Sequence, residues 1–518
     1  MVFNDKNFQQ YQLHLKPILE NKNQKMIPFL DAHTLQQADQ VTQQNRGISS
    51  LALMDLAVDA LLPYALALPS SPLHIICGPG NNGADGLALA QKIQQTGRPV
   101  RVTYTGWSTN YSSEFEHHLR QIQSQHPSLP LVCLMQPIDI QIHKNEIILD
   151  ALFGNGLRGV LAGPYLELIT RVNTHKNPVY SIDMPSGLMH NASGQAPQTF
   201  IQPTCVWVLE IPRLSLIDPN HNTPFVVIPF GLNREYISNQ TATHYLVEPQ
   251  DVMLPGRSKN TYKNREGHVL IIGGSEGMYG APLLSGIAAF KAGAGMVSLQ
   301  MPKEAQVIVH TALPEALFWE RNQQGTMGGI NESLYALYQA FLLGPGLGQT
   351  SHTTSSLIEL LKVRREHLAD CTVLDADALN IISREGAHSL IPKGSILTPH
   401  EGEFARLIGR KVQGMARYDA LLALANQTQS YIVLKGANTC IGTPEGRIYV
   451  NNTGGPSLAT AGSGDVLAGF IAGMLARGIK PGKAALSGVY YHGIAGEVFG
   501  GKPARASEIA QNLRWDTE

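Results

Sequence analysis

The stretch NTGGPSLATAGSGDVLAG, residues 452–469, joins a glycine-rich turn to an acid and to the start of an apolar helical run. Two glycines flank Ser463, and the apolar run 466–475 begins directly after Asp465. Because the first backbone amides of a helix have no partner within it, a loop of this kind binds anions. Asp465 is then placed beside a bound phosphate, where it accepts a proton from a hydroxyl that attacks phosphorus. A glycine-rich turn with an N-capping Asp explains the same residues equally well.

Length and charge set the class of protein. The chain has 518 residues, too many for one ordinary hydrophobic core, so we expect two or more domains. Its 39 basic and 40 acidic residues nearly cancel, and the basic residues form no dense block. We therefore expect small-molecule substrates, and neither nucleic acid nor a membrane surface as a partner.

Cysteine usage and apolar stretches indicate the compartment. The five cysteines are scattered and form no CxxC pair, which suits a reducing compartment and offers no zinc site. The N-terminal residues 1–20 contain no apolar core of the signal-peptide type, and the longer apolar stretches are interrupted by Gly, Pro or charge. We expect a cytoplasmic location. The apolar helical stretch 50–67 suits a subunit interface as well as a core, and we expect a homo-oligomer.

The first half alternates short apolar strands with longer helical patterns. Strands that are apolar throughout and separated by helices predict a parallel sheet covered on both faces, with sites at the carboxyl ends of the strands. The predicted strands are 73–77, 100–105, 147–152, 179–182, 205–209 and 225–228, and the predicted helices are 32–44, 50–67, 86–95, 114–125 and 165–173.

Three of these strand ends carry glycines and oxygen ligands. The loops are CGPGNNGADG at 77–86, DALFGNG at 150–156 and IDMPSG at 182–187. Glycines allow close approach of the backbone to a phosphate, and oxygen ligands at three strand ends of one sheet converge on a cation and a substrate. As alternatives, Asp150 and Ser186 are helix caps and Asp183 accepts hydrogen bonds from loop amides.

Together these loops resemble the YjeF N-terminal domain, a Rossmann-like three-layer sandwich that epimerises damaged NAD(P)H hydrates. The resemblance implies that potassium is bound by Asn82, Asp150 and Ser186, and that Asp183 transfers the proton. It also implies that the hydrated dinucleotide contacts Asn81, Asn82, Gly83, Ala84, Asp85, Gly154, Asn155, Gly156, Leu157, Arg158, Gly159, Val160 and Asp183. Ala84 departs from the family, which usually has glycine there, and its methyl group is accommodated if φ is negative.

The alternation lapses between residues 231 and 267, where the sequence is polar and rich in turn residues. We place the domain boundary there and predict domains at 1–240 and 241–518. A glycine-rich loop after a strand then opens a second α/β sheet. Its predicted strands are 296–300, 340–343, 372–374, 395–398 and 431–434, with a helix at 282–293 and a hairpin formed by 439–442 and 447–450.

Polar residues again follow the strands of the second half, at 344–348, 375–380, 398–404 and 434–439. Lys435 either meets a nucleotide phosphate or is a solvated residue at a strand end. His400 precedes two acids but lacks the second histidine of an HExxH zinc helix. We interpret it as a hydrogen-bonding residue rather than a metal ligand.

These motifs resemble, over about residues 267–496, the YjeF C-terminal domain, the ADP- or ATP-dependent NAD(P)H-hydrate dehydratase with a ribokinase-like fold. The resemblance implies a hydrated dinucleotide that contacts Ala281, Gly346, His400 and Asp465. It places the adenine nucleotide, which carries magnesium, along Lys435, Gly436, Ala437, Asn438 and Thr439 and against Ala461, Gly462, Ser463 and Gly464. Asp465 would remove the proton of the ring hydroxyl, whose phosphorylation allows elimination to NADH or NADPH.

Two other classes of function stay open. A small-molecule kinase of the ribokinase type has the same glycine-rich loop, but often also an Asn-x-x-Glu motif, which this chain lacks. A non-catalytic binding protein would have lost acids or glycines from the loops, whereas Asp183, Asp465 and Asn82 are all present.

Overall fold

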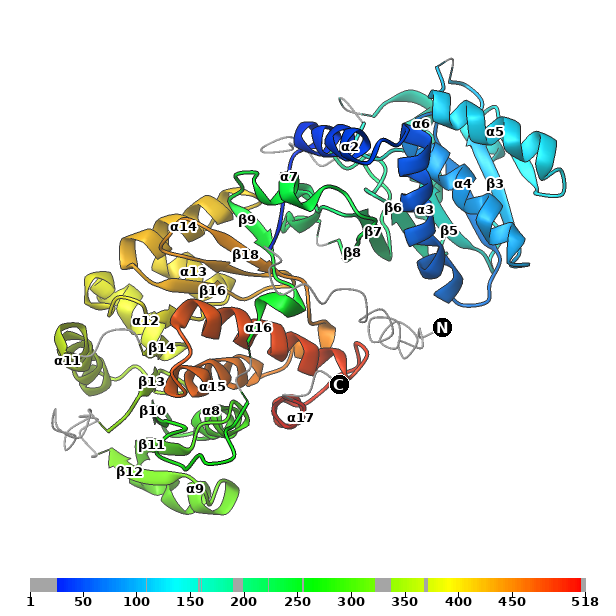
Figure 1. Cartoon of the computed structure of the whole chain (residues 1–518). Helices are drawn as coiled ribbons and strands as arrows, with labels where there is room; N and C mark the ends of the chain where they lie inside the picture. The colour runs from blue at the N-terminus through cyan, green and yellow to red at the C-terminus, as the bar shows by residue number, and fades with distance from the viewer. Residues whose placement is uncertain are drawn as a thin grey trace. The chain divides into compact units, whose positions relative to one another are not determined.

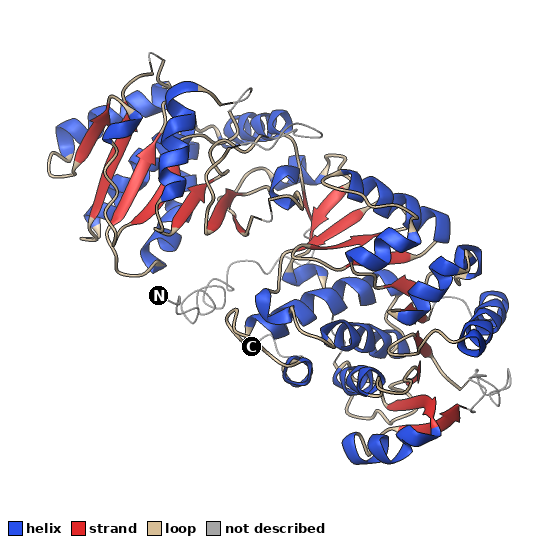
Figure 2. Cartoon of the chain, turned by 180° about the vertical axis from the view of Figure 1, so that it is seen from behind, coloured by secondary structure: helices blue, strands red, loops and turns tan. Residues whose placement is uncertain are grey.

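The computed structural model describes residues 26–108, 110–156, 159, 161–189, 199–221, 223–253, 256–321, 337–367 and 371–513. It contains two compact units, one over Ile27–Ala242 and another that continues from Thr243. Each unit has a central sheet with helices packed on it (Figures 1 and 2). This confirms the predicted α/β class with two separate sheets.

The N-terminal unit is built on a seven-stranded sheet in the order β4-β3-β2-β5-β6-β7-β8, in which every neighbouring pair is parallel. Within this sheet β2 comes first in the chain and is an inner strand. Strands β3 and β4 are added on one side of it, and β5 to β8 on the other. This is the doubly wound, Rossmann-like order, whose direction switches between β2 and β5. The strands are β2 (Leu73–Cys77), β3 (Val100–Thr105), β4 (Leu131–Leu134), β5 (Ile147–Ala151), β6 (Val179–Ile182), β7 (Cys205–Leu209) and β8 (Phe225–Ile228).

Helices cover both faces of this sheet. One core cluster joins the sheet to α3, α4 and α5, and another joins the opposite side chains of the strands to α6. The helices are α2 (Ala32–Arg46), α3 (Ser50–Ala67), α4 (Asn81–Gln95), α5 (Ser113–Gln125), α6 (Gly163–Thr174) and α7 (Arg234–Ser238). Helix α3 is long and apolar enough for a membrane span, yet its residues Met54, Val58, Leu61 and Ala65 are buried in the core cluster.

The second sheet has eleven strands in the order β1-β9-β18-β17-β16-β15-β14-β13-β10-β11-β12. From β16 to β12 all pairs are parallel and again doubly wound, with the switch between β10 and β13. The strands are β1 (Ile27–Pro28), β9 (His244–Leu246), β10 (His268–Ile272), β11 (Met296–Pro302), β12 (Leu317–Arg321), β13 (Ala340–Leu343), β14 (Thr372–Leu374), β15 (Ile396–Leu397), β16 (Tyr431–Leu434), β17 (Thr439–Gly442) and β18 (Ile448–Asn451).

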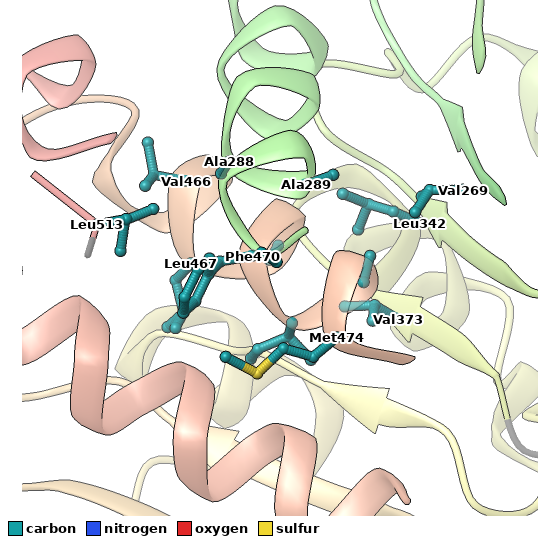
Figure 3. Close-up of a cluster of buried hydrophobic side chains, with 14 of the residues drawn as sticks. Val269, Ala288, Ala289, Leu342, Val373, Val466, Leu467, Phe470, Met474 and Leu513 are labelled. Carbon is teal, nitrogen blue, oxygen red and sulfur yellow. The ribbon is translucent and has the colours of Figure 1, made fainter. Parts of the chain in front are cut away.

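Helix α15 lies at the centre of the second unit and is almost entirely buried. Its glycines allow close packing, because a Cβ on Gly469 would overlap the backbone of Ser285 in α8. Figure 3 shows its side chains among those of α8 and three strands: Val466, Leu467, Phe470 and Met474 with Ala288, Ala289, Val269, Leu342 and Val373. The helices are α8 (Gly280–Lys291), α9 (Gln306–Ala312), α11 (Ser351–His367), α12 (Asp377–Arg384), α13 (Glu401–Leu407), α14 (Ala416–Thr428), α15 (Ser463–Ala476), α16 (Pro481–Glu497) and α17 (Ala506–Gln511).

Most predicted elements are present, and the differences have physical causes. The edge strands β4 and β12 were not predicted, because their side chains are mostly exposed and give no buried apolar run. Helix α4 begins at Asn81, five residues before the predicted start at Gly86. The prediction was late because the first turn consists of residues with low helix propensity, which usually occur in loops. The motif NNGAD is therefore helical rather than a loop.

Candidate active sites

The N-terminal site lies at the carboxyl ends of β2 and β5, the neighbouring strands between which the strand order reverses. These loops pack backbone against backbone, since a Cβ on Gly78 would overlap the carbonyl of Leu152. A Cβ on Gly83 would overlap the carbonyl of Gly78 in the same way. The glycines thus hold the start of α4 directly against the two strand ends, which is the position where doubly wound sheets bind ligands.

The first turn of α4 presents free backbone amides. Its N-cap is Gly80, which has no side chain to bond them, and the first amide bonded within the helix is that of Ala84, to the carbonyl of Gly80 at 3.1 Å. Ala84 is helical and buried, so its φ is negative and its methyl group is accommodated. The departure at Ala84 therefore leaves the amides of this turn in place.

Asn82 is buried, with 7% of its surface exposed, and both polar atoms of its amide lack a hydrogen-bond partner among the described residues. Gly154 lies beside it, because a Cβ on Gly154 would be 3.3 Å from Asn82 Cγ and 2.9 Å from Asp183 Oδ2. A buried amide without a partner is costly, which points to a ligand at this position.

Asp150 and Ser186 are joined directly. The Ser186 hydroxyl donates to Asp150 Oδ1 at 2.5 Å, and the Ser186 amide donates to Oδ2 at 2.9 Å. Neither residue is a helix cap, which removes that alternative. Burial raises the pKa of Asp150, although the hydrogen bonds from Ser186 and Ser181 oppose this shift. No positively charged side chain of the described part of the chain pairs with Asp150, so a bound cation would compensate its charge.

Asp183 is bound by a residue that the sequence analysis missed. Arg213 donates from Nη2 to Asp183 Oδ1 at 2.8 Å and from Nε to Asn155 Oδ1 at 2.7 Å. Asp183 has a φ of 66°, an unfavourable conformation for a residue with a side chain and one that is often found at functional sites. Its carboxylate binds this guanidinium and not a loop amide.

Two further carboxyl groups interact with Asp183: Asp85, which belongs to the predicted first loop, and Asp39, to which no local motif points. Burial, and then the charge of Asp183, raises the pKa of Asp39 in α2 to about 6. The same two causes raise the pKa of Asp85 well above its ordinary value. The site thus places beside Asp183 two acids that hold protons more readily, and groups of this kind serve in proton transfer.

Gly156 is exposed and Gly159 has a φ of 82°, whereas Leu157, Arg158 and Val160 lie outside the described residues. Asn81 is exposed at the first position of α4.

The C-terminal site lies at the corresponding switch between β10 and β13. The amide of Gly274 donates to the Pro345 carbonyl at 2.9 Å, and the Ser275 hydroxyl donates to the Gly346 carbonyl at 2.9 Å. Gly346 has a φ of 57°, and a Cβ there would lie 3.4 Å from the Ala281 side chain. Ala281 and Gly346 are therefore neighbours, as the resemblance implies for two residues of one binding site.

The loop before α15 leads into a second helix N-terminus, where the Ser463 amide donates to the Thr460 carbonyl at 3.3 Å and the amides of Gly464 and Asp465 have no partner among the described residues. Gly462 is its N-cap with a φ of 88° and makes no side-chain cap. Ser463 is buried and lies 3.2 Å, from Oγ to Nε2, from the buried His492 of α16. Asp465 lies in the first turn of α15, and Ser285 of α8 donates to its carbonyl at 2.9 Å. The helix places this acid beside the free amides.

Lys435 connects that turn to the strand ends. Its Nζ is 3.1 Å from the buried Asp375 Oδ1, 4.0 Å from Glu403 Oε2, and 3.1 Å from where a Cβ on Gly464 would be. Only 22% of its side chain is exposed, so Lys435 is not a solvated surface residue. Burial, followed by the charge of Asp375, raises the pKa of Asp465 to about 7, while Lys435 opposes the shift.

His400 is a hydrogen-bonding residue, as predicted. Its Nδ1 accepts from the amides of Gly402 and Glu403 at the start of α13, and 55% of its side chain is exposed. Within the described ranges there is no group of three or more His, Cys, Asp or Glu side chains placed for a metal ion. Of the other residues implied for the nucleotide, Gly436, Ala437 and Ala461 are exposed, and Asn438 and Thr439 are half-buried, so this strip is accessible.

Comparison with known proteins covers both units. The family model described as YjeF-related protein N-terminus matches residues 50–215, and the model described as NAD(P)H-hydrate dehydratase matches residues 269–514. The chain is 31% identical to a bifunctional NAD(P)H-hydrate repair enzyme of Moorella thermoacetica, over 90% of this chain and 92% of that protein. It is also 31% identical to the protein of the same name in Coxiella burnetii, over 87% and 91% of the two chains.

Solved structures each match about half of the chain or less. A Bacillus subtilis ADP/ATP-dependent NAD(P)H-hydrate dehydratase, co-crystallized with ATP and magnesium, is 33% identical and covers 50% of this chain and 92% of its own, with a TM-score of 0.43. A ribokinase-like superfamily protein of Enterococcus faecalis is 25% identical, covers 53% of this chain and 95% of its own, and has a TM-score of 0.47.

Proposed function

The chain belongs to the family of bifunctional NAD(P)H-hydrate repair enzymes, and on this premise we propose that each of its two sites carries one of two complementary reactions. The N-terminal site interconverts the R and S hydrates of NADH and NADPH. The C-terminal site dehydrates the S hydrate to NAD(P)H at the expense of ADP or ATP. The family assignment decides against the small-molecule kinase considered above.

The observation that carries the C-terminal assignment is the position of Asp465 in the first turn of α15, next to Gly464, whose Cβ would lie 3.1 Å from Lys435 Nζ. Asp465 accepts the proton of the ring hydroxyl as its oxygen attacks the terminal phosphorus. The new P–O bond forms while the bond to the bridging oxygen of the nucleotide breaks. Lys435 and the free amides of this turn, such as that of Gly464, stabilise the charge on the transferring group.

Phosphate is then eliminated from the ring. The C–O bond breaks, a proton leaves the adjacent carbon, and the double bond of the reduced nicotinamide is restored. Magnesium bound to the nucleotide supplies charge neutralisation. Because the described part of the chain offers no dedicated metal cluster, we propose that magnesium enters on the nucleotide phosphates, as it commonly does.

In the N-terminal site, the free amides of α4 bind the dinucleotide phosphates and Asp183 transfers the proton. A monovalent cation fits among Asn82, Asp150 and Ser186. The Asn82 amide has no partner among the described residues, and the buried Asp150 carboxylate has no cationic partner among them. Potassium there would offset the Asp150 charge and order the loops around it. Homo-oligomerisation and a cytoplasmic location stay predictions from the sequence.

The test supplies the purified chain with mixed R and S NADH hydrates, potassium, magnesium and either ADP or ATP, and follows the return of NADH absorbance. Complete recovery, faster than spontaneous epimerisation, is expected, and the effective nucleotide identifies the donor. Recovery of the S form alone would contradict the epimerase assignment. No recovery with either nucleotide would contradict the dehydratase assignment.

A further inference from the structure

Arg213 is the only described arginine in contact with the N-terminal site residues that the resemblance implies, and no local motif points to it. It is 2% exposed and lies beyond β7, whereas its two side-chain partners follow β5 and β6. One buried guanidinium therefore connects three successive strand ends of the sheet. Burying a charged guanidinium costs desolvation free energy, so the groups that Arg213 holds in place indicate its role.

The guanidinium makes a separate bond to each loop. Nε binds Asn155 Oδ1 at 2.7 Å, and Nη2 binds Asp183 Oδ1 at 2.8 Å. The third donor, Nη1, binds the carbonyl of Ile211, which fixes the plane of the fork. Lysine has one nitrogen on a flexible stem and cannot reproduce two bonds in these fixed directions.

The segment that carries Arg213 is itself held in place. Glu210 has a φ of 62°, and its carboxylate accepts from the amides of Phe230 and Gly231 at 2.7 and 2.8 Å. The backbone before Arg213 is thus anchored to the chain that follows β8. The fork is a rigid support and not a surface side chain that adjusts to its partner.

The consequence for Asp183 is geometric. Arg213 occupies Oδ1, whereas Oδ2 lies on the same side of Gly154 as the Asn82 amide, which has no partner among the described residues. The free oxygen is thereby directed to the place where the dinucleotide is proposed to bind. The charge of Asp183 acts on Asp39 of α2 and on Asp85 of α4, and the charge of Arg213 opposes its effect on the pKa of Asp39.

We propose that Arg213 is a positioning residue of the epimerase site, whose fork ties the Asn155 loop to Asp183 and aims Asp183 Oδ2 at the substrate. This inference rests on the proposed epimerase function of the N-terminal unit. It adds to that function a residue that acts through Asp183 rather than on the substrate.

The test measures epimerase kcat and KM for R213M, R213K, D183N and the double variant R213M/D183N. We expect R213M to lose about 100-fold in kcat with little change in KM, because a misaimed group slows the chemical step. R213K retains charge but loses the fork and should recover only a small part of that loss. The double variant should have the same kcat as D183N alone, because Arg213 is proposed to act through the Asp183 carboxylate, which D183N has already removed.

R101M is the matched control. Arg101 is also paired with a buried carboxylate, with Nε 2.6 Å from Glu146 Oε1, but it lies near the amino end of β3, away from the site. It should lower thermal stability without lowering kcat. Dehydratase activity of each variant comes from the other unit and measures the amount of intact chain, and thermal unfolding shows whether the N-terminal unit is folded.

Wild-type epimerase activity in R213M, full activity in R213K, or losses that multiply in the double variant would each overturn the inference. If R213M does not fold, R213K and its combination with D183N decide the same question. An inactive wild-type epimerase would instead contradict the proposed function itself.

Discussion

Lys435 and Asp375 lie 60 residues apart in the chain, yet Lys435 Nζ is 3.1 Å from Asp375 Oδ1. They meet because β16 and β14 end at the same edge of the sheet with β15 between them. The Thr398 hydroxyl, at the end of β15, donates to the same Asp375 oxygen at 2.8 Å. Burial opposes the Lys435 charge, but Asp375 and Glu403 raise its pKa, so a cation stays beside the phosphate-binding turn.

The pH dependence of dehydration should follow Asp465. Burial and Asp375 raise its pKa to about 7, and the group must be ionised to accept a proton. The value of kcat/KM should therefore be low at acidic pH and should increase as the pH rises through about 7, where Asp465 loses its proton. In D375N, loss of a like charge should move this limb to lower pH. The measurement is dehydration of the S hydrate across a pH series, and a limb that stays in place in D375N would contradict the assignment.

Removing the Asp465 carboxylate should separate the two activities. D465N keeps the shape of the side chain at the helix start, so the fold should be retained. Dehydratase kcat should fall by about 10²- to 10⁴-fold, the usual contribution of a general base. Epimerisation of the R hydrate by the same preparation is the control and should be unchanged. A variant that still dehydrates at the wild-type rate would show that another group takes the proton.

The glycines of the first loop should differ in tolerance. A Cβ on Gly83 would overlap the Gly78 carbonyl, whereas a Cβ on Gly80 would meet no atom within 4 Å. G83A should therefore destabilise the N-terminal unit by about 1–3 kcal/mol. G80A should cost less, about 0.5–1 kcal/mol, because alanine is a poorer N-cap than glycine. Thermal unfolding together with epimerase activity checks this pair. Equal stability of the two variants would refute the close packing of the loops.

Removal of potassium should slow epimerisation. When choline replaces potassium, the buried Asp150 carboxylate would lose the counterion proposed for it, and the Asn82 amide would lose its proposed ligand, so epimerase activity should fall. In N82A the remaining activity should respond little to potassium. Activity is titrated with potassium chloride at constant ionic strength, and wild-type activity that is the same in both salts would exclude the cation site.

Local patterns were sufficient for much of this molecule. Apolar runs located the buried strands, and Gly-rich loops marked the strand ends where we place the sites, because side-chain burial and backbone freedom depend on neighbouring residues. The acid of the α15 turn and the oxygen ligands at Asp150, Asp183 and Ser186 follow from the same patterns. Exposed edge strands were missed because they lack a buried run.

The contacts that complete the sites could not be predicted in this way. Arg213 reaches Asp183 from another strand end, Asp375 holds Lys435 across β15, and Asp39 approaches from α2. Each depends on how distant segments pack, and on burial that removes water and strengthens charge interactions. The sequence by itself determined the two sheets and the kinds of group at their strand ends. Only the tertiary structure decided which of those groups form ion pairs, which carboxyl groups influence one another's pKa, and which amide is left without a partner. The physical reason is that folding brings residues that are far apart in the chain within a few ångströms.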